Sequence, residues 1–149
     1  MTRRQLRDAV ASIGCGALVA ASLLLAGCTA RPALRAQDAW IRAAEGPHAT
    51  AAYFEVVNGG PDSVVVTAIS GDFAESFPMH ETVRDGAMMS MREVGSMRVP
   101  PHGVLKLEPG AGHVMVMQLR RNLVAGERVR MTLHLRDGRE LPVVATVRQ

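Results

Sequence analysis

Residues 77–94 read Phe-Pro-Met-His-Glu-Thr-Val-Arg-Asp-Gly-Ala-Met-Met-Ser-Met-Arg-Glu-Val, which is two alternating segments on either side of Asp85-Gly86. An Asp-Gly pair between alternating segments is a strong signal for a two-residue hairpin turn. We therefore expect two antiparallel strands, over 77–84 and 87–94. In the register that this turn imposes, His80 stands directly across from Met91.

The same pattern of short apolar segments and turn residues continues on both sides of this hairpin. Breaks occur at 58–61, 100–103, 109–110 and 137–138, all of which contain glycine or proline. No segment has the periodicity of a helix longer than two turns. Many short strands with regular turn signals are typical of an all-β sandwich. Besides the hairpin, we expect strands over residues 39–43, 51–57, 64–70, 104–108, 113–119, 128–135 and 140–147.

The chain opens with a basic segment, an apolar segment and a short ending of small residues. Three arginines precede the apolar residues 9–26, and the segment ends in Leu25-Ala26-Gly27-Cys28. This length and order are typical of a secretory signal, which is too short for a stable membrane span. Leu-Ala-Gly-Cys resembles the lipobox of bacterial lipoproteins, in which Cys28 would be lipidated. The alternative is an ordinary signal with an incidental cysteine.

We therefore expect a signal peptide over 1–27, a lipidated tether over 28–37 and a single folded domain over 38–149. Each buried CH2 group contributes roughly 0.8 kcal/mol, so two or three acyl chains would hold the protein firmly on the periplasmic side of a membrane. The resemblance to Gram-negative lipoproteins implies the outer rather than the inner membrane, because Thr29 and not aspartate follows the cysteine.

The composition of the mature chain excludes several kinds of function. Removal of residues 1–27 takes away three arginines and one aspartate, which leaves 14 basic and 13 acidic residues. A nearly neutral domain without a basic run gives no support for nucleic-acid binding. Cys15 leaves with the signal and Cys28 would carry lipid, so the domain has no thiol for a blue-copper centre or a thiolate zinc site.

Methionine and histidine gather in one part of the chain. Seven of the nine methionines and three of the five histidines lie between Met79 and Met117. Within this part, His80, Met91, His113 and Met115 form the pattern H-x10-M-x21-H-x-M. Two imidazoles and two thioethers are a donor set that favours one Cu(I) ion. His113 and Met115 are two residues apart on a predicted strand and should therefore share a face.

This spacing resembles that of the periplasmic copper chaperone family PCuAC. Further similarity lies in Asp38-Ala39-Trp40-Ile41-Arg42 and in His113-Val114-Met115-Val116-Met117. The resemblance implies a cupredoxin-like β-sandwich with a Greek key, and His80, Met91, His113 and Met115 as ligands of one Cu(I) ion. It also implies a monomeric chaperone, not an enzyme, that delivers copper to cytochrome c oxidase, to an oxidase subunit directly or with a Sco-type partner. Some members carry a second, Cu(II)-preferring site in a His- and Met-rich C-terminal tail, which we do not expect here because Val147 is followed by Arg148 and Gln149.

The methionines and histidines of this domain also allow roles without a metal. Methionine is a common core residue, which we expect for Met131 and also for Met88 and Met97. Met79, Met89 and Met117 could either shield an ion or pack in the core. Copper sequestration without delivery is one alternative function, and a metal-free lipoprotein that binds a protein partner through a Met-rich surface is another. His48, His102 and His134 are expected to be solvated.

Overall fold

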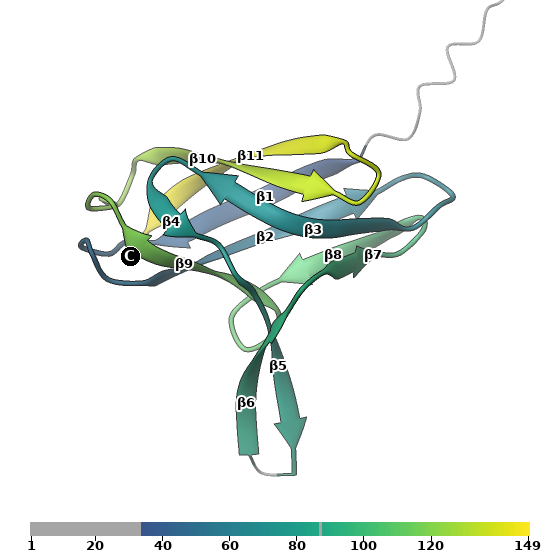
Figure 1. Ribbon diagram of the computed structural model, residues 1–149, viewed down its shortest axis with the longest axis horizontal. Coiled ribbons are helices and arrows are strands. Elements are labelled where there is room, and N and C mark those ends of the chain that lie inside the picture. Colours follow the sequence, from purple (N-terminus) through teal and green to yellow (C-terminus); the bar gives the residue numbers. More distant parts are fainter. Residues whose placement is uncertain (1–33, 87) are drawn as a thin grey trace, which may run out of the picture.

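A computed structural model describes residues 34–86 and 88–149 of the chain (Figure 1). The expected all-β class is confirmed, and the described residues form strands joined by turns and loops. These strands are β1 (Arg35–Arg42), β2 (Thr50–Asn58), β3 (Val64–Gly71), β4 (Ala74–Ser76), β5 (Met79–Asp85), β6 (Met88–Val94), β7 (Met97–Val99), β8 (Gly103–Leu107), β9 (His113–Leu119), β10 (Arg128–Leu135) and β11 (Glu140–Arg148).

The strands form one mixed sheet that folds over on itself around a single core. Its order is β6-β5-β9-β2-β1-β11-β10-β3-β7, with β4 added to β9 and β8 added to β2. All of the strand pairs are antiparallel except β1 with β11. Large side chains at the centre of the core include Phe54, Phe73 and Leu133, which are almost fully buried. Figure 1 shows the β5–β6 hairpin projecting away from this sandwich.

Each of the nine predicted strands overlaps an observed one, but two observed strands were not predicted. β4 and β7 are three residues long, which is too short for a period of two to be recognisable. β1 begins at Arg35, inside the segment predicted as tether, because Leu34 and Ala36 pack against the core. The predicted signal peptide, Cys28 and the tether up to residue 33 lie outside the described residues.

The predicted register of the β5–β6 hairpin is wrong by two residues. Met91 lies across from Thr82, and Glu93 takes the place across from His80. The observed register puts the buried Met79 opposite Val94, whereas the predicted one would have put it opposite Arg92. Apolar pairing at the base of the hairpin therefore sets the register, and Asp85 remains in its strand as the partner of Met88.

β9 connects the hairpin to the body of the sandwich. It pairs with β5 through Met79–Val114 and His80–His113, and with β2 through Ala51–Met115. The pairing of β5 with β9 is a long-range contact, and it is this contact that brings residues 80 and 113 together. No helix among residues 34–86 and 88–149 is long and apolar enough to span a membrane.

Candidate metal centre

His80 and His113 lie directly opposite each other on neighbouring strands. Their ring centroids are 5.6 Å apart, with 44° between the ring planes. His113 is buried and His80 is half-buried. Two imidazoles held side by side at this distance provide two nitrogen donors on one face of the sheet.

The two predicted methionine ligands lie on the same face as these histidines. Met115 is two residues after His113 on β9, and side chains two apart on a strand share a face. Met91 lies across from Thr82 on β6, so it is a diagonal neighbour of His80 rather than its direct partner. The register error of two residues therefore leaves Met91 on the predicted face, because an even shift preserves the alternation of side chains.

A pocket of about 400 Å³ opens at this place. Among the four predicted ligands, His113, Met91 and Met115 line it directly, while the ring of His80 lies next to that of His113. Met91 is 68% exposed and comes from the projecting hairpin, so one wall of the pocket faces solvent. The lining residues are Ala51, Tyr53, Thr82, Met89, Ser90, Met91, Pro109, Gly110, His113 and Met115.

The turn before β9 fixes the orientation of His113. The Nδ1 atom of His113 lies 3.3 Å from the carbonyl oxygen of Ala111, and Thr82 donates a hydrogen bond from its hydroxyl to the same oxygen at 2.8 Å. A ring nitrogen that bonds to a carbonyl must carry the proton, which leaves the lone pair on Nε2 of His113. This arrangement is the usual one for a histidine that binds a metal through its other nitrogen.

His80 has the opposite feature, a buried nitrogen without a partner. Its Nδ1 atom is inaccessible to water and makes no hydrogen bond to the residues that the structure describes. Buried polar atoms almost always have a partner, so an orphan one calls for an explanation. A metal ion bound at this nitrogen would supply the missing partner.

Aromatic side chains continue the site across the sheet. Tyr53 lines the pocket, with its ring centroid 6.4 Å from that of His113 and 4.4 Å from that of Trp40. The guanidinium of Arg148 lies 5.6 Å from the Trp40 centroid, within the range of a cation–π contact. The pocket is therefore bordered by an aromatic surface on the side away from the hairpin.

Sequence reasoning missed several residues at this site. Thr82 and Tyr53 line the pocket and were not predicted to take part. The pairing of Met79 with Val94 is the signal that would have given the correct register and so placed Thr82 across from Met91. The involvement of Tyr53 depends on the pairing of β2 with β9, which no local pattern reveals.

The other methionines differ in how far they are buried. Met97 and Met131 are buried in the core as expected, and Met79 joins them. The core position predicted for Met88 is wrong: its side chain is 74% exposed, because it lies near the tip of the projecting hairpin. Met89 is also exposed and lines the pocket, whereas Met117 is half-buried.

The other histidines lie outside the pocket. His48 and His102 are exposed, and the ring of half-buried His134 contacts Ser70 and Glu140.

The chemistry of the pocket follows from this donor set. Within the described part of the chain, no group of three or more His, Cys, Asp or Glu side chains could hold a metal ion. A site here must therefore combine the two imidazoles with thioether sulfur. Such a set suits a soft monovalent ion, and unlike a thiolate set it is not lost through disulfide formation outside the cytoplasm.

Comparison with known proteins supports this fold and places the chain in a family. Residues 34–147 match the model of the family described as "Putative lipoprotein LpqE-like". The "Putative lipoprotein Lxx21020" of Leifsonia xyli subsp. xyli is 35% identical over 136 residues, which cover 91% of this chain and 81% of that protein.

Solved structures with the same fold include copper proteins. The Cu(I) form of DR1885 from Deinococcus radiodurans is 35% identical, with a TM-score of 0.64, and the match covers 83% of each chain. The copper-bound PCuAC domain from PmoF2 is 22% identical, with the same TM-score, over 77% of this chain and 94% of that one. The expected cupredoxin-like fold is thereby confirmed. The chain belongs to the LpqE-like lipoprotein family, and its fold is that of the PCuAC domains.

Proposed function

We propose that this protein binds one Cu(I) ion through His80, Met91, His113 and Met115. The observation that carries the proposal is the pairing of His80 with His113, with both thioethers on the same face and with the buried Nδ1 atom of His80 unsatisfied by the described residues. The relative DR1885, which is 35% identical, has been solved in its Cu(I) form. That relationship supports the same cargo here.

The geometry favours carriage of copper over catalysis. Four soft or borderline donors would saturate a Cu(I) ion and leave no open position for activation of water or a substrate. Met91 lies on an exposed hairpin strand, so one donor can leave without disturbing the sandwich. A site with one exposed donor at the surface is suited to release of its ion to a partner.

Delivery to cytochrome c oxidase is the destination that we propose for this copper. The chain would act as a monomer, held by lipid at Cys28 on the periplasmic side of a bacterial membrane, and pass its ion to an oxidase subunit or a Sco-type protein. Its membership of a lipoprotein family supports the anchor.

A deletion strain should lose oxidase activity and regain it with added copper. Copper sensitivity with normal oxidase activity would instead indicate sequestration.

The ligand set can be tested by competition with a chromophoric Cu(I) chelator. The intact chain in detergent should retain one ion, and the double variant His113→Ala with Met115→Ala should lose it. The control is His48→Ala with Met88→Ala, because both of these side chains are exposed and the pocket does not include them. Full retention by the first double variant would refute the ligand set.

A further inference from the structure

Four arginines occupy one face of the sheet beside the metal pocket. Arg42 pairs with Arg148 across β1 and β11, and Trp40 pairs with Thr146, which also faces Arg128 of β10. Arg130 follows two residues after Arg128 and therefore shares its face. We call Arg42, Arg128, Arg130 and Arg148 the arginine face.

These four side chains are exposed, and no ion pair neutralises them among the described residues. The ion pairs in that part of the chain use other cations. Four guanidinium groups on neighbouring strands repel one another. An acidic surface docked here would compensate their charge.

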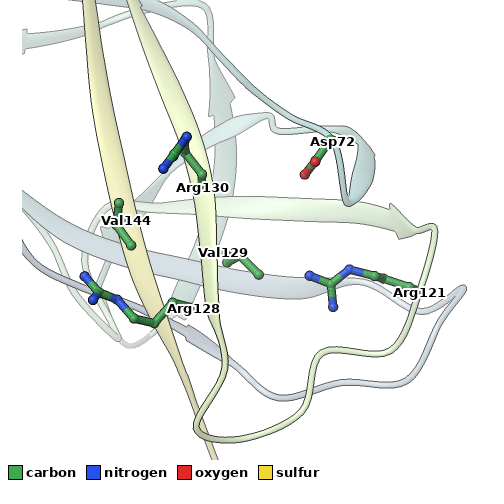
Figure 2. A pocket seen from close by; sticks show the side chains of 6 residues that line it. All are labelled: Asp72, Arg121, Arg128, Val129, Arg130 and Val144. Carbon is green, nitrogen blue, oxygen red and sulfur yellow. The ribbon is translucent and has the colours of Figure 1, made fainter.

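A hollow of about 500 Å³ borders the arginine face at Arg128 and Arg130, and Asp72, Arg121, Val129 and Val144 line the rest of it. Figure 2 shows Arg128 and Arg130 on one strand, with Arg121 extending from the preceding loop and Asp72 on the far side. Arg121 is already bound to Glu127 at 2.8 Å, so Arg128 and Arg130 are the groups free to bind an incoming carboxylate. Guanidinium groups bind carboxylates in a bidentate manner, which gives both affinity and orientation.

The arginine face is continuous with the metal pocket. Arg148 stacks on Trp40, Trp40 contacts Tyr53, and Tyr53 lines the pocket beside His113. Tryptophan, tyrosine and arginine are the residues that most often dominate the energy of protein interfaces. A partner seated on the arginine face would thus extend over the opening from which the ion must leave.

We propose that the arginine face, with Trp40 and Tyr53, is the docking surface for an acidic protein that accepts the copper ion. This rests on the proposed function, because the partner is taken to be the acceptor. A protein is favoured over an anionic membrane because the pocket opens on the same face. An acidic acceptor bound there would place its own metal ligands next to Met115. A membrane bound there would instead cover the opening of the pocket, through which the ion must leave.

The test is site-specific photo-cross-linking in cells of the source organism. A benzophenone side chain is placed at Val144, which is exposed between the arginines and lines the hollow. The expected result is one main protein adduct with an acidic surface, which disappears in the double variant Arg128→Glu with Arg130→Glu. The matched control is Arg98→Glu with Arg136→Glu, which makes the same change of charge at exposed positions of β7 and of the β10–β11 turn. This control should retain the adduct.

The cross-linked partner is then identified and purified without the cross-link, and its binding to the intact chain is measured in detergent. Reversal of Arg128 and Arg130 should weaken binding at least tenfold, and the affinity of the unmodified pair should fall as salt is raised. A lipid adduct, no protein adduct, or an adduct indifferent to the charge reversal would overturn the proposal.

Copper retention is measured on the same preparations to keep the two proposals distinguishable. Loss of the adduct with unchanged Cu(I) binding in the reversed variant is the result expected for a docking surface. If the charge-dependent adduct forms but the intact chain binds no Cu(I), the arginine face is a docking surface, but the partner is not a copper acceptor and that part of the proposal is overturned together with the copper function.

Discussion

The buried Nδ1 atom of the half-buried His80 carries a cost for the metal-free protein. An unsatisfied buried polar atom destabilises the folded state by about 1–3 kcal/mol. The Nδ1 atom of His80 is such an atom among the described residues, whereas that of His113 is satisfied by the carbonyl of Ala111. The two histidines of the pocket should therefore respond differently to substitution in the absence of metal.

Replacement of His80 by leucine tests this difference. His80→Leu removes the unsatisfied atom and keeps a side chain of similar volume, so the metal-free variant should unfold about 4 °C higher, equivalent to about 1 kcal/mol. The same variant should hold Cu(I) less tightly. Thermal unfolding with and without Cu(I) measures both effects.

The control is His48→Leu, at an exposed position away from the pocket. Its melting temperature should change little, because surface substitutions are usually worth less than about 0.5 kcal/mol. A lower melting temperature of metal-free His80→Leu would mean that this imidazole stabilises the fold without metal.

At the scale of elements, the β5–β6 hairpin is the part of the site most open to perturbation. Among the described residues its strand pairings with the sandwich lie at its base, at Met79 and His80, and Thr82 adds a hydrogen bond to Ala111. The hairpin nevertheless supplies Met91. Its turn contains Gly86 at a φ of 60°, in the left-handed region that a β-branched residue adopts only with strain. The order of the hairpin, and with it the position of Met91, therefore depends on this glycine.

Replacement of Gly86 by valine should loosen the hairpin without unfolding the sandwich. The left-handed conformation costs a residue with a Cβ atom roughly 1–2 kcal/mol. Gly86→Val should thus speed hydrogen exchange of the β5 and β6 amides, leave β10 and β11 protected, and weaken Cu(I) binding. Gly86→Asn is the control, because asparagine tolerates this conformation. Equal loss of protection in all strands would show that the hairpin is part of the global folding unit.

The elements also show what the sequence can and cannot predict. Period-two alternation was enough for nine strands and for the shared face of His113 and Met115, because both are local properties. The Asp-Gly pair located the hairpin but not its register, since pairing of Met79 with Val94 outweighed the preferred turn position. The contact of β5 with β9, and so the meeting of His80 with His113, is long-range and has no local signal.

The difference between local and long-range information also explains which methionine positions were predicted correctly. Met131 and Met97 lie on strands of the sandwich and are buried, as their apolar character predicts. Met88 is equally apolar but exposed, because a hairpin that leaves the sandwich has no core to cover it. Hydropathy alone cannot distinguish these cases, since it does not say which strands remain in the body of the molecule.

For the whole molecule, the stability of the sandwich should depend on pH through a few bound carboxylates. Hydrogen bonds from Gln37 and Lys106, at 2.9 and 3.1 Å, lower the pKa of Glu55 below its usual 4.5. A carboxyl group whose pKa is lowered by folding stabilises the native state above its unfolded pKa. That contribution is lost as the pH falls through the lower, folded value.

We therefore expect the melting temperature of the intact chain to fall as the pH is lowered through and below 4.5. Glu55→Gln should reduce this fall, because the substituted side chain cannot take up the proton. Glu75→Gln, at an exposed carboxylate of β4, is the control and should leave the profile unchanged. Scanning calorimetry at a series of pH values makes the comparison, and identical profiles for all three proteins would rule out a role for Glu55.

The exposure of three methionines on one hairpin strand also has a chemical consequence. Met88, Met89 and Met91 present their sulfur atoms to solvent, whereas Met79, Met97 and Met131 are shielded by the core. Peroxide converts an accessible thioether to a sulfoxide, whose oxygen is a poor substitute for a soft sulfur donor. Oxidation should thus begin at the hairpin and weaken metal binding before it affects the fold. Reduction of the sulfoxides would then restore metal binding without refolding.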